Sequence, residues 1–283
     1  LIQFLLKKGN WMKKIILSIC TLFVCSLSAN SDLDLFKGLK GTLNIAGGTA
    51  HIASQKEAMK NIMEAYPEIT MTIAGGGTGV GIKQVTEGLV DIANAGRAPK
   101  KDEIERGDLK SFVFAMDGIA VIVNNNSDIK NLSTEQLIDI FTGKVKSFKD
   151  LGLKGGKINL YVRDASSGTM EVFTNEGIKN AQISQDAKVV ASNAAMKTAV
   201  LSDKNGIGFI SFGTVDDSVK AICIDNRCPS NETILNGEYH ISRGLYMVTK
   251  GEPKPLAKAF IDYMKSNSGA EITSKLGLIP YQK

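Results

Sequence analysis

Residues 42–79 read TLNIAGGTAHIASQKEAMKNIMEAYPEITMTIAGGGTG, and this stretch decides the fold class that we expect. An apolar run ends in glycine at 47–48, and Ala58, Ile62, Met63 and Tyr66 then recur at helical spacing. A second apolar run follows and again ends in glycines. Strands that alternate with helices imply parallel sheets, whose ligands bind beyond the carboxyl ends of the strands. The stretch therefore predicts an α/β protein.

The same alternation continues through the chain without an internal repeat or a long linker. Two apolar runs, GIAVIVN (118–124) and RGLYMVTK (243–250), are the strands best placed to cross between two lobes. We expect residues 30–118 and 244–283 in the first lobe and 119–243 in the second. Further strands are predicted at 91–98, 112–116, 157–163, 206–212 and 219–224, and further helices at 133–143, 255–266 and 268–277.

The first 29 residues have the pattern of a secretory signal peptide. Two lysines precede the uncharged run 15–27, and the small residues SAN follow it. This run is shorter than the roughly 20 residues that a membrane-spanning helix needs. We expect cleavage near Ala29 and an exported, soluble product. Met12 is a natural first residue for such a leader, so 1–11 is interpreted as a mis-started extension, with Leu1 as the alternative start.

Charge and cysteines narrow the class of protein further. Four lysines lie in the predicted leader, so the formal net charge falls from +5 to about +1 without it, which gives no basic field for nucleic acid. Cys20 and Cys25 are not preceded by the small residue that lipoprotein processing requires. Cys223 and Cys228 are expected to form a disulfide in an oxidising compartment. Only two histidines are present, so we expect no metal and no cofactor.

Three segments share one design, in which a strand ends in glycine and hydroxyl residues and a helix follows at once. They are residues 46–51, 74–81 and 163–169. Helix N-termini offer free backbone N–H groups, and glycine lets an anion approach them. One such loop is more often an ordinary helix cap. Three of them together with the two-pronged donor Arg163 indicate a small oxyanion site.

Other chemistries fit the sequence less well. The phosphate-binding pattern G-x-x-x-x-G-K-[ST] is absent, and the glycines of 75–81 do not fit G-x-G-x-x-G in any register. No G-x-S-x-G motif surrounds Ser166 or Ser167. We expect His51 to be a solvated or capping histidine. The sequence therefore predicts a binding protein and not an enzyme.

The order of these motifs resembles one known family. GGGTGVGIKQV, DIANAGRAPK, DGIAVIVN, VRDASSGTMEVF, GIGFISF and ISRGLYMVTKG follow a glycine–threonine first loop, and together they cover about 41–280. The chain resembles the phosphate-binding subunit of the ABC-type phosphate uptake system, a type II periplasmic binding protein. The resemblance implies a monomeric periplasmic protein with two parallel or mixed sheets flanked by helices and joined by crossing hinge strands. Its lobes would close on inorganic phosphate and deliver it to membrane permease subunits. A receptor for sulfate or molybdate, or a secreted phosphatase-like or sensor relative, is the alternative.

The resemblance also implies a set of site residues. The proton acceptor that distinguishes phosphate from sulfate is expected to be Asp117, with Asp164 as the second choice. Asp117 could instead be a turn residue or the salt-bridge partner of Arg97. Members often carry serine where this chain has Gly48 and Gly96, which removes two hydroxyl donors. The implied phosphate ligands are Gly48, Thr49, Ala50, Thr78, Arg97, Asp117, Arg163, Ser167, Gly168 and Thr169.

Overall fold

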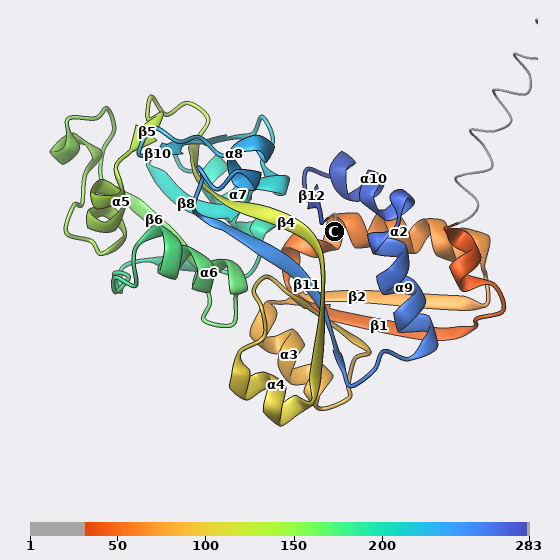
Figure 1. Ribbon diagram of the computed structural model, residues 1–283. Coiled ribbons are helices and arrows are strands. Elements are labelled where there is room, and N and C mark those ends of the chain that lie inside the picture. Colours follow the sequence, from red (N-terminus) through yellow and green to blue (C-terminus); the bar gives the residue numbers. More distant parts are fainter. Residues whose placement is uncertain (1–31, 282–283) are drawn as a thin grey trace, which may run out of the picture.

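The computed structural model describes residues 32–281. The predicted signal peptide and the extension 1–11 lie outside the described residues. The architecture is a curled mixed sheet flanked by helices (Figure 1). Among residues 32–281, no helix has the length and apolarity needed to cross a bilayer.

The first part of the sheet contains the predicted strand–loop–helix units. Strand β1 pairs in parallel with β2 on one side and with β3 on the other, and β11 then pairs antiparallel with β3. Helices α2, α3, α4, α9 and α10 flank this part. The bounds are β1 Gly41–Gly47, α2 Ile52–Ala65, β2 Ile69–Gly76, α3 Thr78–Thr86, β3 Ile92–Ala95, α4 Lys101–Gly107, β11 Ser242–Lys250, α9 Pro255–Lys265, α10 Asn267–Lys275 and β12 Ile279–Pro280.

The second part of the sheet continues from β4 through β8 and β6 to β7. The β4–β8 pair is antiparallel, and the β8–β6 and β6–β7 pairs are parallel. A separate two-stranded sheet joins β5 to β10. The bounds are β5 Asn131–Leu132, α5 Thr134–Phe141, β6 Asn159–Arg163, α6 Gly168–Val172, β7 Lys188–Val190, α7 Asn193–Leu201, β8 Gly206–Ser211, β9 Val219–Ala221, β10 Cys223–Ile224 and α8 Asn231–Leu235.

Strand β4 (Leu109–Asn124) connects the two parts of the sheet. Its residues 109–118 pair with β11, and its residues 119–123 pair with β8. The two apolar runs that the sequence presents on either side of Asp117 are therefore one strand of 16 residues. The family resemblance implied two sheets, but in the structure the strands form one hydrogen-bonded sheet that is continuous through β4. Figure 1 shows β4 and β11 running together from one body of the molecule to the other.

The buried apolar side chains form two groups, which we call the first core and the second core. The first core draws on residues 36–115 and 245–278, with Phe36 and Phe260 fully buried. The second core draws on residues 119–241 together with Ile279. Phe173 and Phe209 stack in it with ring centroids 3.9 Å apart. The change from one core to the other occurs along β4, next to Asp117 and Gly118.

The disulfide prediction is confirmed, because Cys223 and Cys228 are bonded to each other. The bridge closes the turn that follows β10, where Asp225 and Asn226 have positive φ angles of 51° and 62°. Asp225 also accepts hydrogen bonds from the backbone N–H and the hydroxyl of Thr134, at 2.9 and 2.6 Å. The bridge therefore fixes an edge of the second core.

Reduction of this bridge should lower stability without changing anion binding. Closing a loop this short is worth about 2 kcal/mol of unfolding free energy in the chain-entropy account. Urea unfolding of a Cys223→Ala/Cys228→Ala variant should show this loss, and its affinity for the anion should stay within about twofold of the parent. A much larger loss of affinity would mean that the turn belongs to the site.

Candidate anion-binding site

The three glycine and hydroxyl loops meet at one place in the structure. Because β2, β1 and β3 are parallel neighbours, the segments that follow them emerge at the same edge of the sheet. The loop after β6 approaches the same edge from the second core, so that the backbone N–H of Gly79 donates to the carbonyl of Ser166 at 2.8 Å. The cavity enclosed there is lined by Gly48, Thr49, Ala50, His51, Gly77, Thr78, Gly96, Arg163, Ser167, Gly168, Thr169 and Arg243.

This cavity is small and polar. Its free volume is about 10 Å³, which is on the order of the room for one small ion or water molecule. A nucleotide or a sugar would not fit without separation of the walls. Eight of the ten predicted ligands line the cavity, and Arg97 and Asp117 do not.

Arg163, at the end of β6, is a buried cation. Only 2% of its surface is exposed. Its Nε donates to the carbonyl of Val190 at 3.1 Å and its Nη2 to that of Ala191 at 3.0 Å. Within residues 32–281, no carboxylate lies within 4.0 Å of its guanidinium. Burial lowers the pKa of Arg163 and the nearby Asp164 raises it, yet an arginine keeps its charge in a protein. The site therefore holds an uncompensated positive charge.

Arg243, on β11, is a second buried guanidinium, which the sequence interpretation missed. Its Nη1 donates to Thr169 Oγ1 at 2.9 Å and to the carbonyl of Gly96 at 3.3 Å. Its Nε and Nη2 donate to Asp117 Oδ2 at 3.1 and 2.8 Å. A signal was present in the sequence, since an arginine at the start of an otherwise apolar crossing strand needs a buried partner.

Asp117, which was expected to face the anion, does not line the cavity and pairs with Arg243. Asp117 is 2% exposed and accepts from Arg243 on one oxygen and from the Ser211 hydroxyl on the other, at 2.9 Å. Burial raises the pKa of the Asp117 carboxyl, while the hydrogen bonds from Arg243 oppose that rise. Asp164, the second choice, accepts from the backbone N–H of Ser166 at 2.9 Å and does not line the cavity either. Asp117 therefore positions Arg243 instead of contacting the cavity.

Arg97, also expected among the phosphate ligands, lies outside the lining of the cavity as well. Its Nη1 and Nη2 donate to Glu103 at 2.7 and 2.8 Å, and its Nε donates to Glu171 at 2.6 Å. Lys100 adds an ion pair to Glu171 at 2.9 Å. The guanidinium of Arg97 is thus paired with two carboxylates, which hold it outside the cavity. We call Arg97, Lys100, Glu103 and Glu171 the ionic cluster, and it joins α4 to α6.

The hydroxyl groups of the cavity are oriented as donors. Thr78 Oγ1 accepts from the backbone N–H of Gly96 at 2.9 Å. Ser167 Oγ caps α6 by accepting from the N–H of Met170 at 3.3 Å. Thr169 Oγ1 accepts from Arg243 as described above. Within residues 32–281 none of these three hydroxyls donates a hydrogen bond, so each proton can be given to a ligand.

Glycine is required where the two sides of the cavity touch. A Cβ on Gly168 would lie 2.4 Å from Thr78 Oγ1, and one on Gly96 would lie 2.6 Å from Arg243 Nη1. Gly77 has φ +89°, and its Cβ would lie 2.7 Å from Ser166 Oγ. A serine at position 96 would therefore collide with Arg243 in this arrangement.

His51 is not the solvated residue that the sequence predicted. It stands at the N-cap position of α2, as the alternative had it, but its side chain makes no capping hydrogen bond. Its side chain is fully buried and lines the cavity. Its Nε2 lies 3.1 Å from the carbonyl oxygen of Tyr246, and its ring packs against Phe114 with centroids 5.5 Å apart. Burial, helped by the charge of Arg243, lowers the pKa of His51 to about 3. The imidazole is therefore neutral at physiological pH.

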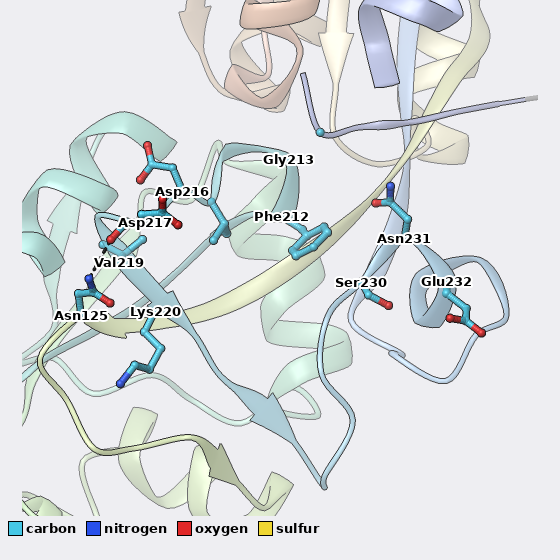
Figure 2. A pocket seen from close by; sticks show the side chains of 12 residues that line it. Asn125, Phe212, Gly213, Asp216, Asp217, Val219, Lys220, Ser230, Asn231 and Glu232 are labelled. Carbon is cyan, nitrogen blue, oxygen red and sulfur yellow. Dashed lines mark hydrogen bonds between the residues drawn. The ribbon is translucent and has the colours of Figure 1, made fainter. Parts of the chain in front are cut away.

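A larger hollow of about 860 Å³ lies elsewhere in the molecule and does not suit an anion (Figure 2). It is wide open, and Asp216, Asp217 and Glu232 line it together with a single lysine, Lys220. The carboxylates would repel a negative ligand. Within the described residues 32–281, no group of three or more His, Cys, Asp or Glu side chains could hold a metal ion.

Comparison with known proteins assigns the chain to a family. Residues 38–268 match the family model of the PBP superfamily domain. The chain is 35% identical to the phosphate-binding protein PstS of Bacillus subtilis over 260 residues, covering 89% of this chain and 86% of the relative. It is 30% identical to PstS of Borreliella burgdorferi over 281 residues, covering 95% and 99%.

Solved structures give the same result. A substrate-binding protein from Clostridium perfringens, whose crystal structure contains bound phosphate, superimposes with a TM-score of 0.81 at 32% identity and covers 86% of this chain and 100% of its own. An ABC-type phosphate transport receptor from Vibrio cholerae gives 0.69 at 31% identity, covering 84% and 99%. These relatives are binding proteins. The chain belongs to the PBP superfamily, within the family of the phosphate-binding proteins PstS.

Proposed function

We propose that this protein binds inorganic phosphate between two lobes in the periplasm and delivers it to the permease subunits of an ABC importer. The observation that carries the proposal is the buried guanidinium of Arg163, which lines a small polar cavity and has no carboxylate partner within residues 32–281. A buried charge without a partner costs several kcal/mol, and a bound anion would remove that cost. Resemblance to PstS proteins supports phosphate as the anion.

The cavity can supply the donors that a dehydrated phosphate requires. Two guanidinium groups and one carboxylate leave a net positive charge beside it, and the Thr78, Ser167 and Thr169 hydroxyls add oriented protons. A net gain of ~0.5–3 kcal/mol per hydrogen bond over several bonds is enough for the ~8 kcal/mol of a micromolar complex. The ligand set that we propose is Gly48, Thr49, Ala50, Thr78, Arg163, Ser167, Gly168, Thr169 and Arg243.

We further propose that the first core and the second core are the two lobes, divided at 30–118 plus 244–283 and 119–243. Motion would then hinge on β4 and β11, the two strands that pass from one core to the other. The closed arrangement is supported by direct contacts, such as Ser166 Oγ donating to the carbonyl of Gly76 at 2.8 Å. We expect a monomer that acts by capture and release, without metal, cofactor or catalysis.

Calorimetric titration of the exported form, stripped of bound ions by partial unfolding and dialysis, tests the function. Phosphate should bind with 1:1 stoichiometry and a Kd at or below about 1 μM. Arsenate, which has the same shape and carries a proton, should compete. Sulfate or molybdate binding more tightly than phosphate would overturn the assignment in favour of another oxyanion.

The ionic cluster gives a prediction about closure. Glu171 lies on α6, in the second core, and accepts from Arg97 and Lys100, which belong to the other side of the cavity. Glu171→Gln should weaken phosphate binding about 2- to 5-fold, because a partly exposed ion pair contributes up to ~1 kcal/mol and only the closed form contains this one. Raised salt should weaken the parent more than the variant. Lys101→Gln, which affects only an exposed pair with Glu105 at 3.8 Å, is the matched control. Equal affinities for Glu171→Gln and the parent would show that the cluster does not stabilise closure.

A further inference from the structure

The cavity presents a chemical problem once the two aspartates are excluded from its lining. Phosphate near neutral pH carries a proton, whereas sulfate carries none. A site that prefers phosphate needs a hydrogen-bond acceptor for that proton, and the same acceptor repels the bare oxygen of sulfate. No residue that lines the cavity is a carboxylate. The hydroxyls of Thr78, Ser167 and Thr169 already accept from Gly96, Met170 and Arg243, and the Gly96 carbonyl also accepts from Arg243. The fourth hydroxyl, on Thr49, accepts from the backbone N–H of Asn193 at 3.5 Å.

Among the side chains that line the cavity, His51 carries the only nitrogen that can accept a hydrogen bond. Carbonyl oxygens accept and do not donate, so the contact between Nε2 and the Tyr246 oxygen at 3.1 Å fixes the proton on Nε2. Nδ1 then carries a lone pair. This atom is fully buried and has no hydrogen-bond partner in the structure.

Gly48 lies beside His51 Nδ1 and has no side chain that would press against it. A Cβ at Gly48 would lie 3.1 Å from both His51 Nδ1 and His51 Cε1, and Gly48 lines the cavity as His51 does. The backbone of Gly48 has φ −57°, so glycine is not needed there for conformation. The missing side chain instead leaves space beside the imidazole edge.

We propose that His51 Nδ1 accepts the hydrogen bond from the protonated oxygen of bound phosphate and thereby discriminates phosphate from sulfate. This inference rests on the proposed function. The proton remains on phosphate, and the imidazole remains neutral. Buried beside the cation Arg243, the ring does not take up a second proton that would turn Nδ1 into a donor for sulfate.

The test compares phosphate and sulfate affinities of stripped protein by calorimetry. His51→Phe keeps a ring of similar size and removes the acceptor. Phosphate binding should weaken about tenfold or more, sulfate binding should stay equal or improve, and the ratio of the two should fall at least tenfold. His240→Phe, at the other histidine, should leave both affinities unchanged. If phosphate and sulfate affinities fall together, His51 is merely structural and the proposal is wrong.

A second measurement, NMR of the parent protein, tests the proposal even if His51→Phe does not fold. In protein with ¹⁵N-labelled histidine, the two ring nitrogens of His51 should have the chemical shifts of a neutral ring that is protonated at Nε2. The His51 signals are those that remain in His240→Phe, or those that are lost in His51→Phe. Saturating phosphate should move the Nδ1 resonance toward that of a hydrogen-bonded nitrogen. An unmoved Nδ1 in phosphate-bound protein would overturn the role of His51 and leave the proposed function intact. Absence of phosphate binding by the parent would instead remove the function itself.

Discussion

Replacing Arg163 by alanine should weaken phosphate binding by two to four orders of magnitude. The guanidinium has no carboxylate partner in the described chain, so bound phosphate would supply its counter-charge under the proposed function. Removal of one member of a buried charge pair costs ~3–5 kcal/mol, and each ~1.4 kcal/mol is a tenfold change in affinity. Arg163→Lys should recover only part of this loss, because lysine keeps the charge and loses the two-pronged geometry. Calorimetry on stripped protein measures both variants.

Stability should respond much less than binding in the Arg163 variants. Arg163→Ala leaves the carbonyls of Val190 and Ala191 without their donor, so the free energy of unfolding should fall by no more than about 2 kcal/mol. Arg106→Ala removes an exposed arginine of α4 that lies 3.6 Å from Asp102, and it should change neither quantity. Near-equal phosphate affinities of Arg163→Ala and the parent, with intact melting curves, would exclude Arg163 from the site.

Replacing Arg243 by methionine should impair both binding and stability. Affinity for phosphate should fall at least 100-fold, since one of two guanidinium groups is lost. The free energy of unfolding should also fall by ~3–5 kcal/mol, because Asp117 is left buried without its partner. Urea unfolding of anion-free protein measures the second effect.

A double variant separates these two effects. In Arg243→Met/Asp117→Asn the buried charge is gone and the side chain at 117 can still bond Ser211, so most of the lost stability should return. Phosphate binding should not return. If it did, Arg243 would be only the counter-ion of Asp117. If stability stayed low, the pairing of Arg243 with Asp117 would not be what the fold depends on.

Local features of the fold were predictable because their causes are local. The loops after β1, β2 and β6 follow from glycines and hydroxyls that end apolar runs, and these features lie within a few residues of one another. The terminal helices α9 and α10 follow from apolar spacing. The continuity of β4 was not predictable in this way, because Asp117 and Gly118 form a local break in apolarity that pairing with β11 overrides.

The identity of the second arginine depends on distant contacts. Arg97 lies two residues after β3 and was expected at the site from the family resemblance, whereas Arg243 was not among the expected ligands. In the structure Arg243 is opposite Asp117 in the register of β11 and β4, 126 residues away along the chain. Arg97 instead forms ion pairs with Glu103 and Glu171. The burial of His51 has the same origin, since its partner Tyr246 is 195 residues away.

The most direct test of the central claim is the position of the anion in a crystal. Arsenate is a tetrahedral phosphate analogue whose arsenic atom scatters anomalously, so its site can be located independently of the refined coordinates. The account predicts one strong anomalous peak in the cavity between the guanidinium groups of Arg163 and Arg243, with His51 Nδ1 facing one arsenate oxygen. If the protein binds arsenate to saturation in solution and the anomalous peak in the crystal lies anywhere else, for example beside Lys220, the account is contradicted.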